Sequence, residues 1–529
     1  MYVLGIHKDP WHDTGAALIR CDNEKTDFVF VSEERLNRVK DSRAYPDHSI
    51  RSCLKEFGLS SIDQVDLVVM DYIRDKNWRA DHFKMPCVIP RELEAMPPRK
   101  IHVMNHHLAH ASAVFYSSGF KKSAVLVVDG RGSENETQSL YVADDSGIRL
   151  VASTKTIGIG LLYAAVTQAV GFKLLQEGKT MGLAPFGANV QPPVFQFSRR
   201  FKGIVTDYSD SCVEGSYAMG IPHRSLEKFE DQARAAYDVQ MECEAAMDHL
   251  ARWAKEETGM EYLCISGGVA LNSVTNYKIL MSGLYKDVFI NPAASDTGIP
   301  LGAALYGLHN ILGIKRNYTG INPFLGPSYS AKEVKNAIDE FNGYRVVHHD
   351  AVDAAVKMLA DNKIVACHYG RSEMGPRALG NRSILMSPLR AENKDILNAR
   401  VKHREAFRPF APVVLEENMA EYFVMDRPCP YMLFVPQVRT EKKSVIPAVT
   451  HVDGSGRLQT INRTLNPLFY TIIEKFSNLT GVPVMLNTSF NDNNEPIVES
   501  PADAIRCFMG TNIDALLIGG DTLLIKNEK

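Results

Sequence analysis

Short apolar runs that alternate with helical stretches constrain the fold of this chain more than any other feature. The runs are YVLGI (2–6), FVFVS (28–32), DLVVM (66–70), AVLVVD (124–129), YLCIS (262–266) and DVFIN (287–291). Between them lie stretches such as residues 233–257, in which apolar residues recur at helical spacing. Buried strands that alternate with helices predict an α/β protein whose sheets are covered on both faces.

The first residues of the chain predict a particular kind of α/β domain. The runs YVLGI, GAALI and FVFVS indicate three strands joined by short turns between residues 2 and 32. A β-meander that opens an α/β domain is typical of the actin/Hsp70-like (ASKHA) architecture, although other folds begin in the same way. We therefore expect an actin/Hsp70-like first domain.

The chain is too long for one hydrophobic core. It has 529 residues, and chains beyond about 250–300 residues usually divide into domains. Glycine, proline, serine and asparagine are concentrated between residues 317 and 333, which is typical of a connecting segment. We predict a first domain at 1–330, a linker region at 317–344 and a second α/β domain at 345–529.

Composition excludes several function classes. The net charge is −3, so nothing global predicts binding to nucleic acid or to a membrane surface. None of the nine cysteines forms a Cys-x-x-Cys pair, which argues against a zinc ribbon or a thioredoxin-like site. The odd number of cysteines favours a reducing compartment. The first residues do not resemble a signal peptide, and no apolar run has the length of a membrane span. We expect a cytoplasmic protein.

The segment NHHLAHASAVFYSSG (105–119) predicts a helix with two histidines on one face. His106 and His110 are four residues apart and so lie one turn from each other. This pair alone also fits an apolar helix that carries histidines for structural reasons. Asp129 ends a predicted strand, and Asp296 lies in SDTG after another; each alone also fits a helix cap or a turn. Two histidines and two aspartates would suit iron(II), manganese or zinc better than calcium.

Further polar and glycine-rich elements lie in the predicted first domain. Gly267 and Gly268 follow a predicted strand in CISGGVALNSV, with Asn272 one turn into the next helix. This element could hold a nucleotide, and plain close packing explains it as well. His12 lies in a turn of WHDTG, where an acid/base role and a surface turn are both open. Lys179, in LLQEGKTMGLAPFG, is a candidate nucleotide contact, and an ordinary loop fits equally.

The predicted second domain is rich in arginine among glycines. Three segments carry the basic residues Arg371, Arg377 and Arg382, then Lys402, His403, Arg404 and Arg408, then Arg457 and Arg463. Guanidinium groups bind phosphate and carboxylate oxygens with two parallel hydrogen bonds. A phosphate-rich small ligand is therefore expected, with an exposed basic face as the alternative. Clustered aromatic residues that would stack nucleic-acid bases are missing from these segments. Asn487 and Ser489 follow a predicted strand and could hold a phosphate or a sugar.

The motifs taken together resemble one family. They are HDTGAAL, SEERLNRVK, HHLAHA, GKTMGLAPFG, SGGVALN, GRSEMGPRALGNRSI, HREAFRPFAP and LNTSFNDNNEPIV. In this order they resemble the bacterial O-carbamoyltransferases, which carbamoylate nodulation factors, cephem antibiotics, aminoglycosides and ansamycins. The resemblance runs from about residue 3 to residue 520. Eight motifs in sequence are far more specific than any one of them.

The resemblance implies a two-domain enzyme. Its first domain is similar to the actin-like subunit that attaches threonylcarbamoyl groups to tRNA, and its second domain is similar to the YrdC-like α/β domain. In the family, the second domain combines ATP with carbamoyl phosphate and forms carbamoyl adenylate, with release of pyrophosphate. The first domain then transfers the carbamoyl group to an acceptor hydroxyl. The implied partners are ATP with Mg²⁺, carbamoyl phosphate and a small hydroxyl-bearing acceptor, and a homodimer is one option for the assembly.

Motif matching also implies roles for individual residues. The resemblance places an iron or other divalent metal ion on His106, His110, Asp129 and Asp296. It implies that His12 is the general base at the acceptor hydroxyl and that Gly267, Gly268 and Asn272 contact adenosine. It implies an adenylation site made by Arg377, Lys402, Arg408, Arg457, Arg463, Asn487 and Ser489. His107 is expected to be a neighbour of the metal ligands and not a ligand.

Two segments carry expectations of their own. Asn493 and Asn494 stand where many relatives carry an arginine–glycine pair, and the role of this departure is open. Residues 32–46 are expected on the acceptor side, so replacing Arg35 should raise the KM for the acceptor without affecting pyrophosphate release. The sequence does not identify the acceptor.

Other functions remain as alternatives. An actin-fold kinase or phosphotransferase would use the strand–glycine turns for ATP and should form ADP. A nucleotide-sensing binding module should show no turnover. A metallopeptidase would need a glutamate between the histidines, as in His-Glu-x-x-His, and this chain has none there.

Overall fold

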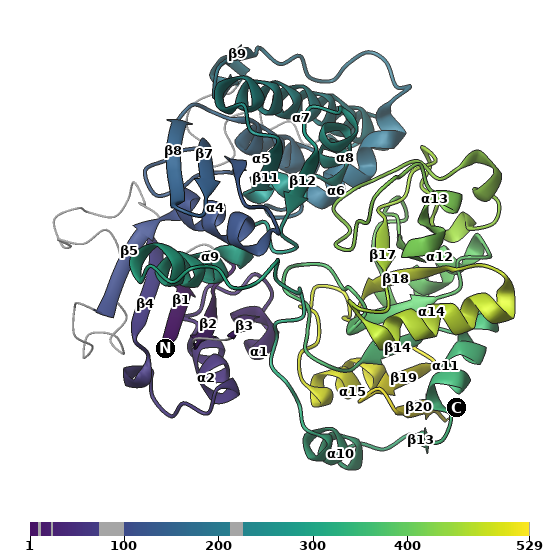
Figure 1. Cartoon of the computed structure of the whole chain (residues 1–529). Coiled ribbons are helices and arrows are strands. Elements are labelled where there is room, and N and C mark those ends of the chain that lie inside the picture. The colour runs from purple at the N-terminus through teal and green to yellow at the C-terminus, as the bar shows by residue number, and fades with distance from the viewer. Residues whose placement is uncertain (9–11, 23–24, 73–99, 212–225, 528–529) are drawn as a thin grey trace. The chain divides into compact units, whose positions relative to one another are not determined.

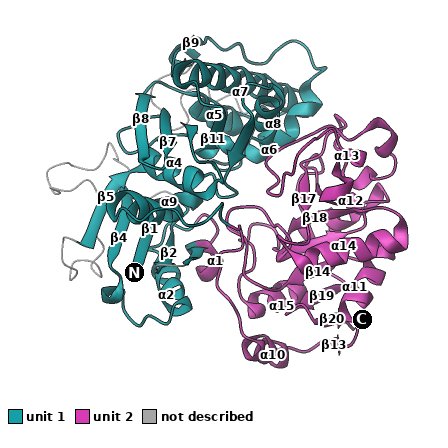
Figure 2. Cartoon of the chain, viewed as in Figure 1, with its two compact units in different colours: residues 1–33, 42–321 teal, residues 34–41, 322–529 magenta. Residues whose placement is uncertain are grey.

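The computed structural model describes residues 1–8, 12–22, 25–72, 100–211 and 226–527. The chain divides into two compact units (Figure 2). Unit 1 comprises residues 1–33 and 42–321, and unit 2 comprises residues 34–41 and 322–529. Both units are built from sheets with helices packed on them (Figure 1).

Unit 1 opens with a five-stranded sheet. Its strands are β1 (Tyr2–His7), β2 (Gly15–Cys21), β3 (Thr26–Ser32), β4 (Leu67–Tyr72) and β5 (Ile101–Asn105), in the order β3-β2-β1-β4-β5. The first three strands form an antiparallel meander, whereas β4 runs parallel to β1 and β5 parallel to β4. Successive residues of β1, such as Val3 and Leu4, are fully buried, so both faces of the sheet are covered. The predicted meander is confirmed.

The second sheet of unit 1 repeats this topology. Its strands are β6 (Ser123–Val128), β7 (Gln138–Asp144), β8 (Gly147–Thr154), β11 (Tyr262–Ser266) and β12 (Asp287–Ile290), in the order β12-β11-β6-β7-β8. Here too an antiparallel meander is extended on its other side by two parallel strands. The two short strands β9 (Arg200–Lys202) and β10 (Val205–Asp207) pair separately. Unit 1 thus contains the same sheet topology twice, which is the actin-like arrangement that the sequence predicted.

Helices connect and cover the strands of unit 1. They are α2 (Asp47–Glu56), α4 (His106–Ser117), α5 (Ile159–Ala169), α6 (Glu177–Leu183), α7 (Phe229–Thr258), α8 (Ser273–Met281) and α9 (Ile299–Tyr306). Helix α1 (Glu33–Asn37) begins in unit 1 and continues into unit 2. Figure 1 shows the long α7 beside α5 and α8, with which it packs.

Close packing of α4 against α9 positions two segments that carry site residues. A Cβ atom on Gly302 would lie 2.0 Å from the carbonyl oxygen of Ala109, so only glycine allows the two backbones to approach this closely. Ala109 lies between the two histidines of α4, and α9 directly follows the turn that contains Asp296. The crossing therefore brings the predicted histidine and aspartate ligands toward one another.

Unit 2 contains an eight-stranded mixed sheet in the order β13-β20-β19-β14-β15-β18-β16-β17. Its strands are β13 (Tyr344–Val347), β14 (Val365–His368), β15 (Arg382–Met386), β16 (Ala411–Leu415), β17 (Gln459–Ile461), β18 (Val484–Ser489), β19 (Ala515–Ile518) and β20 (Thr522–Lys526). Its helices are α10 (Ala331–Glu340), α11 (Ala351–Ala360), α12 (Glu392–Leu397), α13 (Met419–Tyr422), α14 (Pro467–Thr480) and α15 (Pro501–Gly510). This is the mixed α/β class predicted for the second domain.

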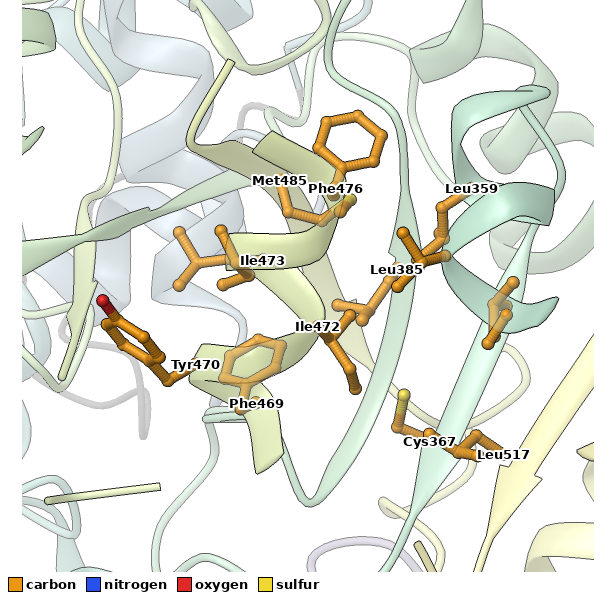
Figure 3. Close-up of a cluster of buried hydrophobic side chains, with 14 of the residues drawn as sticks. Leu359, Cys367, Leu385, Phe469, Tyr470, Ile472, Ile473, Phe476, Met485 and Leu517 are labelled. Carbon is orange, nitrogen blue, oxygen red and sulfur yellow. The ribbon is translucent and has the colours of Figure 1, made fainter. Parts of the chain in front are cut away.

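The core of unit 2 lies between its sheet and the helices α11 and α14. Figure 3 shows Ile472 of α14 near Leu385 of the sheet and Phe476 of α14 near Met485, and all four side chains are buried. Side chains alternate between the two faces of a strand, so the residues between these core positions face the other side. Helix α15 packs on β14 and β19 there.

The predicted domain boundaries remain predictions. The compact units divide between Ile321 and Asn322, and unit 2 also takes up residues 34–41. Helix α10 lies inside the predicted linker region, where Ser330 and Glu333 form a capping box at its start.

In the part of the chain that the structure describes, no helix is both long and apolar enough to cross a bilayer. Seven cysteines are free and buried, whereas Cys87 and Cys212 lie outside the described residues.

Candidate functional site

Helix α4 presents two buried histidines to one point in unit 1. The helix begins at His106 because the side chain of Asn105 accepts the backbone N–H of Leu108 at 3.0 Å. The backbone N–H of His106 donates to Ser133 Oγ at 2.8 Å. His106 and His110 are both fully buried, and their Nε2 atoms lie 3.1 Å apart.

Two aspartates complete this group. Asp129 Oδ2 lies 3.4 Å from His106 Nε2 and 3.1 Å from His110 Nε2. Asp296 Oδ1 lies 3.4 and 3.3 Å from the same two nitrogens. The four ligand atoms lie within 4.8 Å of one another, and all four residues are buried. The structure thus brings together the four residues that the sequence singled out as metal ligands.

The spacing of these atoms fits a bound metal ion. Nitrogen and oxygen ligands about 2.0–2.2 Å from a common ion lie about 3.0–3.5 Å apart, which is the range of the distances between neighbouring ligand atoms here. Imidazole and carboxylate ligands suit divalent transition metals. This group can therefore hold a metal ion.

The charges of the group favour a cation as well. Burial by itself raises the pKa of Asp296, but the nearby imidazoles, led by that of His106, together outweigh it and hold this pKa well below its usual value. Burial by itself lowers the pKa of His106, and neighbouring carboxylates, led by Asp296, raise it well above the usual value. Two carboxylates that face each other in a buried site require positive charge between them. A protonated imidazole or a metal ion can supply it.

Hydrogen bonds outside the group orient both imidazole rings. His106 Nδ1 donates to Asp71 Oδ2 at 2.8 Å, and His7 Nδ1 donates to Asp71 Oδ1 at 2.7 Å. His110 Nδ1 lies 3.3 Å from Ser266 Oγ, which itself donates to a carbonyl oxygen. With the proton on Nδ1, each ring turns the lone pair of Nε2 toward the aspartates. His7, Asp71 and His106 could form a second ligand group, but their contacts are direct hydrogen bonds that leave no room for an ion between them.

Asp71 allows the first test of this arrangement. We expect Asp71→Asn to weaken the binding of a divalent metal by about 10- to 100-fold, because the amide cannot accept both ring N–H groups and His106 loses its fixed tautomer. Titration with Mn²⁺, followed by electron paramagnetic resonance, measures the change. Asp238→Asn is a control of similar burial, since Asp238 bonds Arg234 on α7. Equal Mn²⁺ affinity in both variants would contradict the role of Asp71.

His107 lies outside the metal group. Its Nδ1 lies 2.8 Å from Ser139 Oγ, and burial lowers its pKa to about 3, so the ring is neutral. A Cβ atom on Gly132 would lie 2.6 Å from its ring. His107 therefore fills space in the core, as the sequence predicted for a neighbour of the ligands.

The predicted general base lies beside the metal group. His12 is half-buried, and its Nδ1 lies 3.3 Å from Asp13 Oδ2 and 3.9 Å from Asp296 Oδ2. Asp13 has a φ of 60°, a left-handed conformation that aspartate tolerates better than most residues. The structure thus places His12 near Asp296 of the metal group, and its role as a general base remains a prediction.

The residues predicted to bind adenosine have mixed surroundings. Gly267 has a φ of 92°, and an added Cβ would lie 2.3 Å from Val128 O, so this glycine serves close packing. The backbone N–H of Gly268 donates to Asp129 Oδ1 at 2.9 Å and thus holds a metal-group carboxylate. Asn272 caps α8 and bonds Gln240. Lys179 of α6 lies over the ring of Phe172. Their binding of a nucleotide remains a prediction.

Unit 2 contains a cluster of guanidinium groups, the arginine cluster, formed by Arg377, Arg404, Arg408 and Arg457. Burial lowers the pKa of Arg457 well below its usual value, and the other three arginines lower it further. Burial also lowers the pKa of Arg377 to about 10 and that of Arg404 to about 9. Positive charges are therefore held close together and partly shielded from water.

The arginine cluster has unused hydrogen-bond donors. Among the residues that the structure describes, the buried Nε atoms of Arg377, Arg404 and Arg457 find no hydrogen-bond partner. A buried donor without a partner costs about 1–3 kcal/mol, and an anionic ligand would remove that cost. Arg404 was not among the predicted site residues, although its segment was recognised as basic. The order of residues in this segment does not reveal which side chains turn inward.

The structure does not bring all the predicted residues into the arginine cluster. Arg463 is exposed on the surface, where it pairs with Glu474 at 2.7 Å and lies over Tyr470. Lys402 is buried, and its Nζ reaches Ser489 O, Asn491 O and Asn491 Oδ1 at 2.7–2.8 Å, which uses its three protons. Lys402 thus supports the loop after β18.

Other basic and polar residues of the motifs support the backbone. Asn487 is buried and donates to Ala378 O at 3.1 Å, next to Arg377. Arg382 is fully buried, donates to backbone carbonyls and lies 3.6 Å from Glu499. Arg371 donates to Leu325 O and Gly326 O. Part of the basic density in the sequence is therefore structural.

Comparisons with known proteins match both units. The family model described as Carbamoyltransferase N-terminus matches residues 71–305, and the one described as Carbamoyltransferase C-terminus matches residues 356–526. Nodulation protein NolNO of Sinorhizobium fredii is 36% identical, over 98% of this chain and 79% of that protein. An uncharacterised protein of Methanocaldococcus jannaschii is 30% identical over 98% of both chains. Among solved structures, full-length HypF in a phosphate- and nucleotide-bound form is similar with a TM-score of 0.34 at 14% identity, covering 59% of this chain and 55% of that chain.

Proposed function

The chain belongs to the carbamoyltransferase family, and on this premise we propose that it is an ATP-dependent O-carbamoyltransferase. It activates carbamoyl phosphate with ATP and transfers the carbamoyl group to a hydroxyl of a sugar or another small natural product. The observation that carries the proposal is the arginine cluster of unit 2, whose buried donors lack partners among the described residues. Membership in the family agrees with the resemblance seen in the sequence motifs.

The first step forms carbamoyl adenylate in unit 2. Water releases inorganic phosphate from carbamoyl phosphate and leaves carbamate. A carbamate oxygen then attacks the α-phosphorus of ATP, and the bond to pyrophosphate breaks. ATP, brought with Mg²⁺, and carbamoyl phosphate are both anions, so their approach needs fixed positive charge. Arg377, Arg404, Arg408 and Arg457 provide it without the reorganisation that water would require.

The second step takes place at the metal group of unit 1. The acceptor hydroxyl attacks the carbamoyl carbon, the bond to the AMP oxygen breaks, and the hydroxyl proton passes to His12. A neutral imidazole within reach of the hydroxyl can accept this proton as a general base. A divalent ion on His106, His110, Asp129 and Asp296 would supply electrostatic stabilisation of developing negative charge. Iron(II) is our first choice for this ion, with manganese and zinc as alternatives.

Release of pyrophosphate tests the proposal directly. With ATP and Mg²⁺, we expect the wild-type chain to release pyrophosphate only when carbamoyl phosphate is also present. A coupled pyrophosphate assay measures the rate, and chromatography of the nucleotides separates AMP from ADP. Formation of ADP would replace the proposal with an actin-fold kinase or phosphotransferase, and binding without turnover would replace it with a nucleotide-sensing module.

We propose the cytoplasm as the compartment, since the cysteines that the structure describes are free.

A further inference from the structure

Residues 34–41 belong to unit 2, although the chain on both sides of them belongs to unit 1. This segment contains most of α1 and two arginines, Arg35 and Arg38. The sequence predicted that it serves the acceptor. Its contacts lie with two loops of unit 2, which points to another role for Arg35.

Arg35 holds the loop that carries Arg377. Its side chain is buried, and its Nη2 donates to Gly375 O at 3.0 Å and reaches Glu373 O at 3.5 Å. The loop turns sharply here, since Gly375 has a φ of 83°, a conformation that strongly favours glycine. Arg35 thus fixes the backbone two residues before Arg377.

Glu373 closes the same loop on the other side of Arg377. Its Oε1 accepts the backbone N–H groups of Leu379 and Asn381 at 2.8 Å and of Arg382 at 3.1 Å. The side chain of Glu373 is buried, and hydrogen bonds from N–H groups to a carboxylate are stronger than those between neutral groups. Arg377 therefore projects from a short loop whose backbone is tied at both ends.

Arg38 holds a second loop of unit 2. Its Nη1 donates to Ile497 O at 2.7 Å, and its Nη2 donates to Pro496 O at 2.8 Å. These carbonyl groups lie in the segment that leaves β18, where Asn491 also accepts Lys402. One short segment, residues 34–41, therefore binds the backbone of both loops that carry motif residues of unit 2.

We propose that Arg35 and Arg38 are positioning residues for the activation step and have no part in binding the acceptor. This inference rests on the proposed function, because it assigns Arg377 to the binding of ATP or carbamoyl phosphate. A displacement of about 1 Å in a catalytic group can cost about 100-fold in rate. The arginine cluster works only if each guanidinium is held where the anions bind, and Arg35 fixes one member through the backbone.

Steady-state kinetics of pyrophosphate release test the inference without any acceptor. We expect Arg35→Ala to raise the KM for ATP or carbamoyl phosphate about 10-fold and to lower kcat/KM by about 10- to 100-fold. Arg35→Lys keeps the charge and can donate to one carbonyl, so its loss should be smaller. Arg38→Ala should act in the same direction. Arg51→Ala in α2 is the control, since Arg51 is exposed and 16 positions from Arg35.

The outcomes separate the possible roles. A variant that merely folds less well lowers kcat through its active fraction and leaves KM unchanged, and that result would overturn the positioning role. Rates and KM values equal to those of Arg51→Ala would overturn it too and return Arg35 to the acceptor side. If Arg35→Ala does not fold, the KM values of Arg35→Lys and Arg38→Ala test the positioning role in its place. Failure of the proposed function looks different, because then the wild-type chain itself releases no pyrophosphate.

Discussion

Arg457→Ala is expected to lower carbamoyl-phosphate-dependent pyrophosphate release by about 100- to 1,000-fold, the loss that follows removal of one preorganised donor from a site of developing charge. Arg457 lies among three other arginines that all lower its pKa, and its Nε has no partner among the described residues. The chain thus bears the cost of partly burying this charge before any ligand arrives. Binding of an anionic ligand would offset this cost. The loss of activity in Arg457→Ala should therefore appear in kcat/KM.

The measurement needs two further variants. Arg345→Ala removes an exposed arginine from β13 of the same unit and controls for the loss of one positive charge. Arg463→Ala tests the assignment made from sequence, because this arginine pairs with Glu474 on the surface. A loss in Arg463→Ala as large as that in Arg457→Ala would place the anion site elsewhere in unit 2. A rate of pyrophosphate release in Arg457→Ala within about twofold of the wild type would refute the role of the cluster, since removing one such donor should cost far more.

The metal group could be predicted from the sequence because each of its members follows a local rule. His106 and His110 are separated by one helical turn, and Asp129 and Asp296 follow buried strands. Parallel strands such as β6, β11 and β12 end at the same edge of their sheet, where open α/β sheets place ligands. Strand ends and helical spacing therefore made these four residues candidates, and the family resemblance singled them out from helix caps and turns.

Asp71 and His7 could not be recognised in the same way. Each lies in an apolar strand, where a single polar residue has many structural explanations. They meet because β1 and β4 are neighbouring parallel strands, and this pairing depends on the whole sheet. The hydrogen bonds from His7 and His106 to Asp71 thus arise from long-range contacts that no local pattern contains.

Roles in unit 2 were harder to predict because arginine serves two purposes there. Arg382 and Arg371 satisfy backbone carbonyl groups, whereas Arg457 Nε has no hydrogen-bond partner among the described residues. All of these residues are arginines in glycine-rich motifs, and only the positions of the surrounding carbonyl and carboxylate groups distinguish the two uses.

The departure from the family pattern at residues 493–494 also has a local explanation. Asn494 has a φ of 63°, a conformation that asparagine adopts more readily than other residues with a side chain. Asparagine can therefore stand where many relatives carry glycine.

His110→Ala is expected to reduce the binding of divalent metal by more than about 100-fold, since loss of a ligand should exceed the 10- to 100-fold effect of losing an outer hydrogen bond. His110 Nε2 lies 3.1 and 3.3 Å from oxygens of the two aspartates, and alanine offers no substitute. Metal content after dialysis against a limiting Mn²⁺ solution gives the result. His107→Gln should retain the metal, because His107 lies on the same helix and bonds Ser139.

The same variant separates the two steps of the proposed reaction. The residues that would activate carbamoyl phosphate lie in unit 2, and His110 lies in unit 1. Carbamoyl-phosphate-dependent pyrophosphate release by His110→Ala should therefore stay within about twofold of the wild type, because substitutions at sites that share no partners act independently. Retained metal in His110→Ala would refute the ligand set. Loss of metal together with loss of pyrophosphate release, in a variant that melts like the wild type, would show that activation depends on the metal group, and the proposed separation of the two steps would be wrong.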